Sequence, residues 1–98
     1  MLIMADDIGV ECFSSYGGKD TKTTNLDTLA LSGLRFTHCH AQPSCTPSRV
    51  QVMSGRYNSR NYQGFGWLDP KEVTVANLLK KEGYSTCIAG KWQLLRHH

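Results

Sequence analysis

Residues 45–55 of this chain read Cys-Thr-Pro-Ser-Arg-Val-Gln-Val-Met-Ser-Gly, and they carry signals for both ends of a short helix. Pro47 is tolerated in the first turn of a helix, because the N–H that it lacks would have no partner there. Gly55 suits the residue just past a helix end, where the backbone often turns left-handed. The stretch therefore predicts a helix over residues 46–54, with Cys45 at its N-terminus.

The start of this predicted helix has the chemistry of an anion site. Unpaired N–H groups and the helix dipole favour negative charge there, and Arg49 adds a guanidinium one turn later that can pair with a tetrahedral oxyanion. A thiolate, a phosphate or a sulfate would suit such a place. Cys45 is therefore a candidate for chemistry. A buried cysteine that only packs against its neighbours is an alternative of equal weight, because free cysteines are usually packing residues.

Residues 83–94, Gly-Tyr-Ser-Thr-Cys-Ile-Ala-Gly-Lys-Trp-Gln-Leu, predict a strand followed by a lysine. Residues 84–89 combine β-branched, aromatic and small side chains, and Gly90 opens the turn that follows. Lys91 then lies at the carboxyl end of the strand, the edge where ligands bind in open α/β sheets. It can neutralise an anionic substrate. Taken alone, the segment favours a solvated lysine after a strand.

The first residues form an apolar run, Met-Leu-Ile-Met-Ala, that ends in Asp6 and Asp7. Such a short continuous run predicts a parallel strand over residues 1–5 that is buried on both faces. Two adjacent carboxylates repel each other unless a positive charge lies between them. A hard divalent cation, calcium or magnesium, is the natural partner of these oxygens. A solvated pair of aspartates at the end of a strand is the alternative.

The remaining segments complete an α/β order. We expect a loop over residues 9–23, a strand over 36–41 and a long loop over 56–72. One helix starts at Thr24 or Asn25, and another follows Thr74 and stops at Gly83. Strands that alternate with helices in this way predict a parallel sheet. The expected helices carry apolar stripes made of Leu26, Leu29, Ala30 and Leu34 in the first and Val75, Leu78 and Leu79 in the second.

Composition limits the class of protein. The chain has 98 residues, a net charge of +3 and four cysteines, which allows one small domain at most. The charge is too low and too scattered to indicate nucleic-acid binding. No apolar stretch is long enough to span a membrane, and no signal peptide is visible. Neither the cysteine spacing nor the cluster at residues 38–40 matches a zinc module, so packing roles are favoured for these residues.

Three segments resemble the signatures of the type I sulfatases, the formylglycine-dependent family. Residues 45–55 are similar to C-x-P-S-R followed by an apolar pair, a small residue and glycine. Residues 83–94 are similar to G-Y-x-T-x-x-x-G-K-W-H-L, with Gln93 where many members carry a histidine that contacts the sulfate or the diol. Residues 1–17 resemble the family's opening, an apolar strand, then A-D-D-x-G and a downstream Y-G.

The resemblance implies a fold, an activity and a set of site residues. The fold is an alkaline-phosphatase-like α/β fold, of which residues 1–98 would form the incomplete N-terminal portion of a catalytic domain, a partial parallel sheet with flanking helices. The activity is sulfuric ester hydrolysis through a formylglycine, made from Cys45 by a formylglycine-generating enzyme. Asp6, Asp7 and residue 45 would bind calcium, with magnesium as the alternative ion. Arg49 and Lys91 would steady the diol and the sulfate.

The same resemblance sets limits. The family's remaining metal ligands, its acid-base histidine and a second lysine lie further downstream, so the 98-residue chain is expected to be inactive alone. Its partners would be a sulfate ester and the modifying enzyme. Members are often periplasmic, secreted or lysosomal, and the sequence does not identify the compartment. The alternatives are a phosphonate or phosphate diester hydrolase of the same superfamily and a non-enzymatic binding module.

Overall fold

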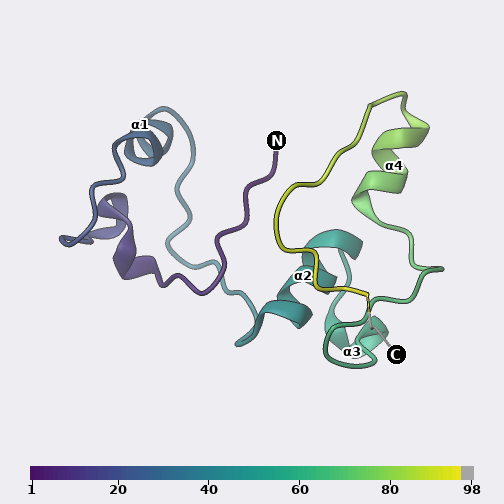
Figure 1. The fold of residues 1–98 in the computed structure, drawn as a ribbon. Coiled ribbons are helices and arrows are strands. Elements are labelled where there is room, and N and C mark those ends of the chain that lie inside the picture. The colour runs from purple at the N-terminus through teal and green to yellow at the C-terminus, as the bar shows by residue number, and fades with distance from the viewer. Residues whose placement is uncertain (96–98) are drawn as a thin grey trace. The chain divides into compact units, whose positions relative to one another are not determined.

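The computed structural model describes residues 1–95, and the chain divides into two compact units. The first unit is Met1–His40 and the second unit is Ala41–His98. Figure 1 shows helix α1 in the first unit and helices α2, α3 and α4 in the second. The bounds of the helices are η1 Val10–Cys12, η2 Ser14–Tyr16, α1 Thr24–Ser32, α2 Cys45–Ser54, α3 Asn58–Asn61 and α4 Val75–Lys81.

Hydrogen bonds between short polar side chains organise the first unit. The backbone N–H of Ser14 donates to Thr23 Oγ1 at 3.0 Å, and the N–H of Thr23 donates to Ser14 Oγ at the same distance. Thr23 is also the N-cap residue of α1, and its hydroxyl donates to Asp27 Oδ1 at 3.0 Å. This reciprocal pair fixes η2 against the start of α1. The expected loop over residues 9–23 therefore contains two 3-10 turns.

The segment that follows α1 returns to the same turns. Tyr16 donates its phenolic O–H to the carbonyl oxygen of Phe36 at 2.9 Å. The guanidinium of Arg35 lies 5.3 Å from the centroid of the Tyr16 ring and donates to the carbonyl oxygen of Ser15. A cation over an aromatic face is attracted by the ring quadrupole. Tyr16, which belongs to the Y-G pair of the sequence, therefore anchors residues 35 and 36.

The hydrophobic core of the described residues lies in the second unit. Val50, Leu68 and Leu94 are buried, with exposed fractions of 0%, 7% and 1%, and Met53 and Trp92 pack against them. Val50 and Met53 come from α2, whereas the other three residues come from loops. The N–H of Leu68 donates to the carbonyl oxygen of Leu94 at 3.2 Å, which joins the two loops. The buried hydrophobic core of the described residues is therefore small, with three side chains.

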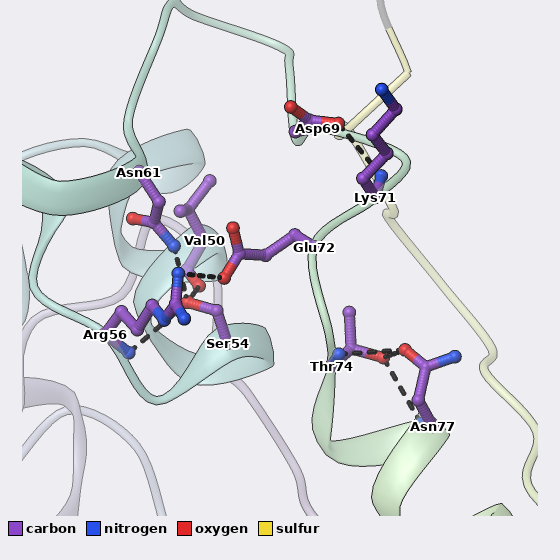
Figure 2. Close-up of polar contacts among 9 residues, drawn as sticks. All are labelled: Val50, Ser54, Arg56, Asn61, Asp69, Lys71, Glu72, Thr74 and Asn77. Carbon is purple, nitrogen blue, oxygen red and sulfur yellow. Dashed lines mark hydrogen bonds and ion pairs between the residues drawn. The ribbon is translucent and has the colours of Figure 1, made fainter.

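Helices α2 and α4 of the second unit are bounded by the local signals that predicted them. Gly55 is the C-cap of α2, is left-handed with φ 67°, and donates its N–H to the carbonyl oxygen of Gln51 at 2.8 Å. Thr74 caps α4 through a capping box: its hydroxyl oxygen accepts from the N–H of Asn77, and the side chain of Asn77 accepts from the N–H of Thr74. Figure 2 shows this box at the start of α4. The helix expected over residues 46–54 is confirmed.

The long loop expected over residues 56–72 needs a correction. It contains the four-residue helix α3, because side chains of this helix hydrogen-bond to α2. Asn58 Nδ2 donates to the carbonyl oxygen of Pro47 at 3.1 Å, and Asn61 Nδ2 donates to Ser54 Oγ at 2.8 Å. Contacts of this kind are tertiary and leave no periodic signal in the sequence.

The three predicted strands are not formed, and residues 1–95 contain no strand at all. The strands over residues 1–5, 36–41 and 84–89 were expected from apolar runs, yet Ile3, Phe36 and Ile88 are exposed by 71%, 61% and 60%. A parallel strand needs neighbours that accept its hydrogen bonds and cover both of its faces. Without such neighbours these segments stay extended or irregular, so the described residues do not confirm a sheet.

The apolar side chains of α1 are also uncovered, with Leu26 exposed by 40% and Leu29 by 65%. The helix ends at Ser32, so Leu34, which was expected on its apolar stripe, lies beyond it. No helix within residues 1–95 combines the length and the apolar character that a membrane crossing requires.

Candidate functional site

Cys45 is the first residue of α2 and is half-buried. The residue before it, Ser44, has an extended backbone and makes no side-chain cap. The loop that leads into the helix is fixed instead by Ser48, whose hydroxyl oxygen accepts from the N–H of Gln42 at 3.1 Å and lies 3.0 Å from the carbonyl oxygen of Ser44. The N–H groups of the first turn are therefore not consumed by a capping side chain of Ser44.

Thr46 and Val50 have structural roles in α2. Thr46 is fully buried, and its hydroxyl oxygen accepts from the N–H of Gly66 at 3.1 Å. Thr46 and Val50 are four residues apart, so they lie on one face of α2, which is the buried face. Cys45 and Arg49 have the same spacing and share the neighbouring face. Burial of the first pair thus orients the second pair together.

Arg49 and Lys91 come together in the second unit. Arg49 Nη1 donates to the carbonyl oxygen of Lys91, 42 residues further along the chain. Residues just after Lys91 are anchored in the core, since Trp92 packs there and Leu94 is 1% exposed. The Lys91 side chain is exposed. The structure therefore places the Arg49 side chain against the backbone of Lys91, and Cys45 lies one turn before Arg49 on the same helix.

Gln93 has two unusual features. Its backbone is left-handed with φ 51°, which is uncommon for a residue with a side chain. Its side-chain oxygen Oε1 is buried and has no hydrogen-bond donor among the described residues. Buried acceptors normally find a donor in protein or water. Gln93 is also the position where the sequence departs from the sulfatase signature.

Asp6 and Asp7 belong to the first unit, whereas Cys45, Arg49 and Lys91 belong to the second. Asp6 is half-buried, and Asp7 is exposed with a left-handed backbone at φ 53°. Short polar aspartates tolerate this conformation better than most residues. Within residues 1–95, no three His, Cys, Asp or Glu side chains come together as a metal site. A shared metal site of Asp6, Asp7 and residue 45 therefore stays a prediction.

The donor chemistry of Asp6 and Asp7 can be compared with what calcium requires. Carboxylate oxygens are the ligands that calcium prefers, and it takes about 6–8 of them. Two aspartates supply at most about four oxygens. The pair fits calcium in the kind of ligand, and further oxygens must come from other residues.

The sequence pattern did not identify the residues that support this site. Thr46, Ser48 and Asn58 each fix the backbone around the start of α2 through hydrogen bonds. A usable signal was present for Ser48, since small polar residues inside a short helix often bond to nearby backbone groups, whereas the partner of Thr46 is Gly66, 20 residues away. Asn58 gave no such signal.

Comparisons with known proteins agree on one family. The family model described as Sulfatase matches residues 1–97. Steryl-sulfatase of Mus musculus is 43% identical over 108 residues, which cover 96% of this chain and 17% of that protein. Arylsulfatase A of Bos taurus is 45% identical over 103 residues, covering 96% of this chain and 20% of that protein. Arylsulfatase G of Mus musculus is 38% identical over 105 residues, which cover 99% of this chain and 20% of that protein.

The chain thus spans about a fifth of the length of the curated relatives that it matches. No solved structure matches it.

Proposed function

Because the chain belongs to the sulfatase family, we propose that it carries the nucleophile-bearing part of a sulfuric ester hydrolase. The observation that supports this most directly is the family match over residues 1–97, which includes α2 with Cys45 as its first residue. The names of the relatives mention steryl and aryl sulfatases, so the proposed substrate is a sulfate ester of a sterol or a phenol. Residues 1–98 would be one part of the catalytic domain.

We propose that Cys45 is oxidised to formylglycine. The hydrated aldehyde supplies two hydroxyl groups on one carbon, one to attack sulfur and one to expel sulfate afterwards. The N-terminus of α2 supports this role, because helix N–H groups and the dipole stabilise negative charge at residue 45. Arg49 contributes a fixed charge on the same face of the helix.

The cations have separate proposed tasks. Arg49 is held by its bond to the carbonyl oxygen of Lys91, so its guanidinium is preorganised to stabilise charge at residue 45. The Lys91 ammonium is exposed and would neutralise an oxygen of the sulfate group. Gln93 offers a buried carbonyl oxygen that needs a donor, and we propose that it takes one from a group bound at this site.

We also propose that Asp6, Asp7 and oxidised Cys45 are ligands of calcium, with magnesium as the alternative ion. When bound, the ion would polarise the sulfate oxygens as a Lewis acid. Asp6 and Asp7 would hold it through carboxylate oxygens. Since they supply only part of a calcium coordination shell, we expect the 98-residue chain to bind the ion weakly and to show no sulfatase turnover.

The family implies an α/β fold, and we propose that the exposed apolar segments join a sheet in that fold. Residues 1–5 have the composition of a strand buried on both faces and residues 84–89 that of a short strand, and large apolar side chains of both segments are exposed in the described residues. Covering them would require strands and helices other than those described here.

Mass spectrometry tests the formylglycine proposal. Trypsin releases residues 36–49, which contain both Cys39 and Cys45. After co-expression with a formylglycine-generating enzyme, we expect residue 45 of this peptide to be about 18 Da lighter than an unalkylated cysteine, while Cys39 carries an alkylated thiol. Arg49→Lys is the matched control, because it keeps the trypsin site and removes the arginine of C-x-P-x-R.

Two results would contradict the proposal. One is a Cys45 that stays a thiol in every molecule, although the modifying enzyme converts a known substrate in the same cells. The other concerns activity: hydrolysis of an aryl sulfate by the purified 98-residue chain would show that the missing ligands are not needed.

A further inference from the structure

The C-terminal end of α2 opens onto a cavity that the proposed catalytic chemistry does not use. Gly55 ends the helix in a left-handed conformation, and the chain then turns into α3. A cavity of about 500 Å³ lies in this turn, lined by Gly55, Arg56, Tyr57 and Arg60. Two of its four lining residues are arginines, and none is acidic.

The two arginines differ in how they are paired. Arg56 Nη1 forms an ion pair with Glu72 Oε1 at 3.1 Å, and the Glu72 side chain is only 12% exposed. Figure 2 shows the Arg56 and Glu72 side chains meeting beside Ser54. In contrast, no described residue pairs with the guanidinium of Arg60 or with the hydroxyl of Tyr57, which is 78% exposed. The cavity therefore has one neutralised cation, one uncompensated cation and one O–H donor.

We propose that this cavity binds a tetrahedral oxyanion, sulfate or phosphate, through Arg60, Tyr57 and Arg56. Guanidinium groups present several N–H donors in a plane that matches oxyanion geometry, and a phenolic O–H adds a further donor. Glu72 holds Arg56 in place, while the uncompensated charge of Arg60 attracts the anion.

This site is separate from the one proposed at Cys45. The ten residues of α2 extend over about 15 Å, because a helix rises about 1.5 Å per residue. Cys45 begins that helix and the cavity lies beyond its end. The inference does not depend on the proposed sulfatase function, since none of the lining residues belongs to the catalytic set.

Titration of the full 98-residue chain with sodium sulfate, followed by backbone amide resonances, tests the proposal. Sodium phosphate is a second arm, and sodium chloride at matched ionic strength is the reference, because unspecific charge effects are screened equally. We expect saturable shifts of the amides of residues 55–60 with both oxyanions and none with chloride. Methyl sulfate distinguishes a free ion from a sulfate group on a larger molecule. If methyl sulfate binds as tightly as free sulfate, the cavity accepts a sulfate group that is attached to a larger molecule. If methyl sulfate does not bind, the cavity accepts the free ion.

Variants assign the donors. Arg60→Gln should weaken sulfate binding about tenfold, Arg60→Lys should weaken it less, and Tyr57→Phe should weaken it about threefold. Lys80→Gln is the matched control, because it removes the same charge from an exposed position on α4 that does not line the cavity. All four variants alter exposed side chains, and unchanged amide spectra without sulfate would verify the fold.

Three results would overturn the proposal. They are shifts confined to residues 45–49, equal shifts with chloride, or equal weakening by Arg60→Gln and Lys80→Gln. Shifts confined to residues 45–49 would leave the anion site of the proposed function intact, so the two ideas fail separately.

Discussion

Ser54 connects three segments of the second unit, and Ser54→Ala tests whether hydrogen bonds hold α3 on α2. Its hydroxyl donates to the carbonyl oxygen of Val50 at 2.6 Å and accepts from Asn61 Nδ2 at 2.8 Å. It also accepts from the N–H of Arg56 at 3.3 Å. Figure 2 shows these groups converging on Ser54. Alanine removes the hydroxyl and keeps the helix.

The expected cost follows from what each partner loses. The bond to Val50 supplements the helix and contributes little, and Arg56 is exposed, so water can replace its lost partner. Asn61 is only 9% exposed, and its Oδ1 already lacks a donor among the described residues. A buried donor left unsatisfied costs about 1–3 kcal/mol. We therefore expect Ser54→Ala to lower the free energy of unfolding of the second unit by about 2 kcal/mol.

Urea unfolding followed by tryptophan fluorescence measures this loss in the correct unit. The chain has two tryptophans, Trp67 and Trp92, and both lie in the second unit. Ser59→Ala is the matched control, because Ser59 is exposed on α3. A double-mutant cycle with Asn61→Ala should give a coupling of about 1 kcal/mol. If Ser54→Ala costs no more than Ser59→Ala, the reasoning is refuted.

Two further substitutions test the core and a turn. Leu94→Ala should lower the free energy of unfolding by about 3 kcal/mol, because it opens a cavity at a side chain that is 1% exposed. The control Leu95→Ala, at a side chain that is 62% exposed, should lower it by less than about 0.5 kcal/mol in the same urea assay. Gly18→Ala should disrupt the turns of the first unit, since its new Cβ would lie 2.3 Å from the backbone oxygen of Glu11, and faster amide exchange in residues 10–18 would report it. Gly64→Ala, whose methyl meets nothing within 4 Å, should leave exchange unchanged.

Local signals predicted the helices because the information lies within a few residues. Pro47 and Gly55 bracket α2, and Thr74 caps α4, so the rules of helix ends were sufficient. The sequence did not predict α3, since its four residues have no period and depend on Asn58 and Asn61 reaching α2. Propensity cannot reveal an element that tertiary hydrogen bonds create.

The strands are a different case. Residues 1–5 and 84–89 have strand composition, yet a strand is stabilised by its neighbours rather than by its own side chains. Composition therefore predicts which segments can join a sheet, whereas pairing requires partners that the described residues do not offer.

The candidate site likewise has a part that the sequence predicts and a part that it does not. The proximity of Cys45 and Arg49 follows from helix spacing, but the bond from Arg49 to Lys91 joins residues 42 apart and could be found only in the structure.

The arrangement of residues 45–50 gives a structural role to the residues that surround the proposed catalytic pair, Cys45 and Arg49. Thr46 and Val50 are both 0% exposed, so one face of α2 is fixed in the core. Since side chains four apart share a face, fixing that face also fixes the direction of Cys45 and Arg49. A hydroxyl at position 46 is required because Gly66 N–H needs an acceptor there. Thr46 and Val50 therefore set the direction in which Cys45 and Arg49 leave the helix, and such preorganisation would favour the nucleophile proposed at residue 45.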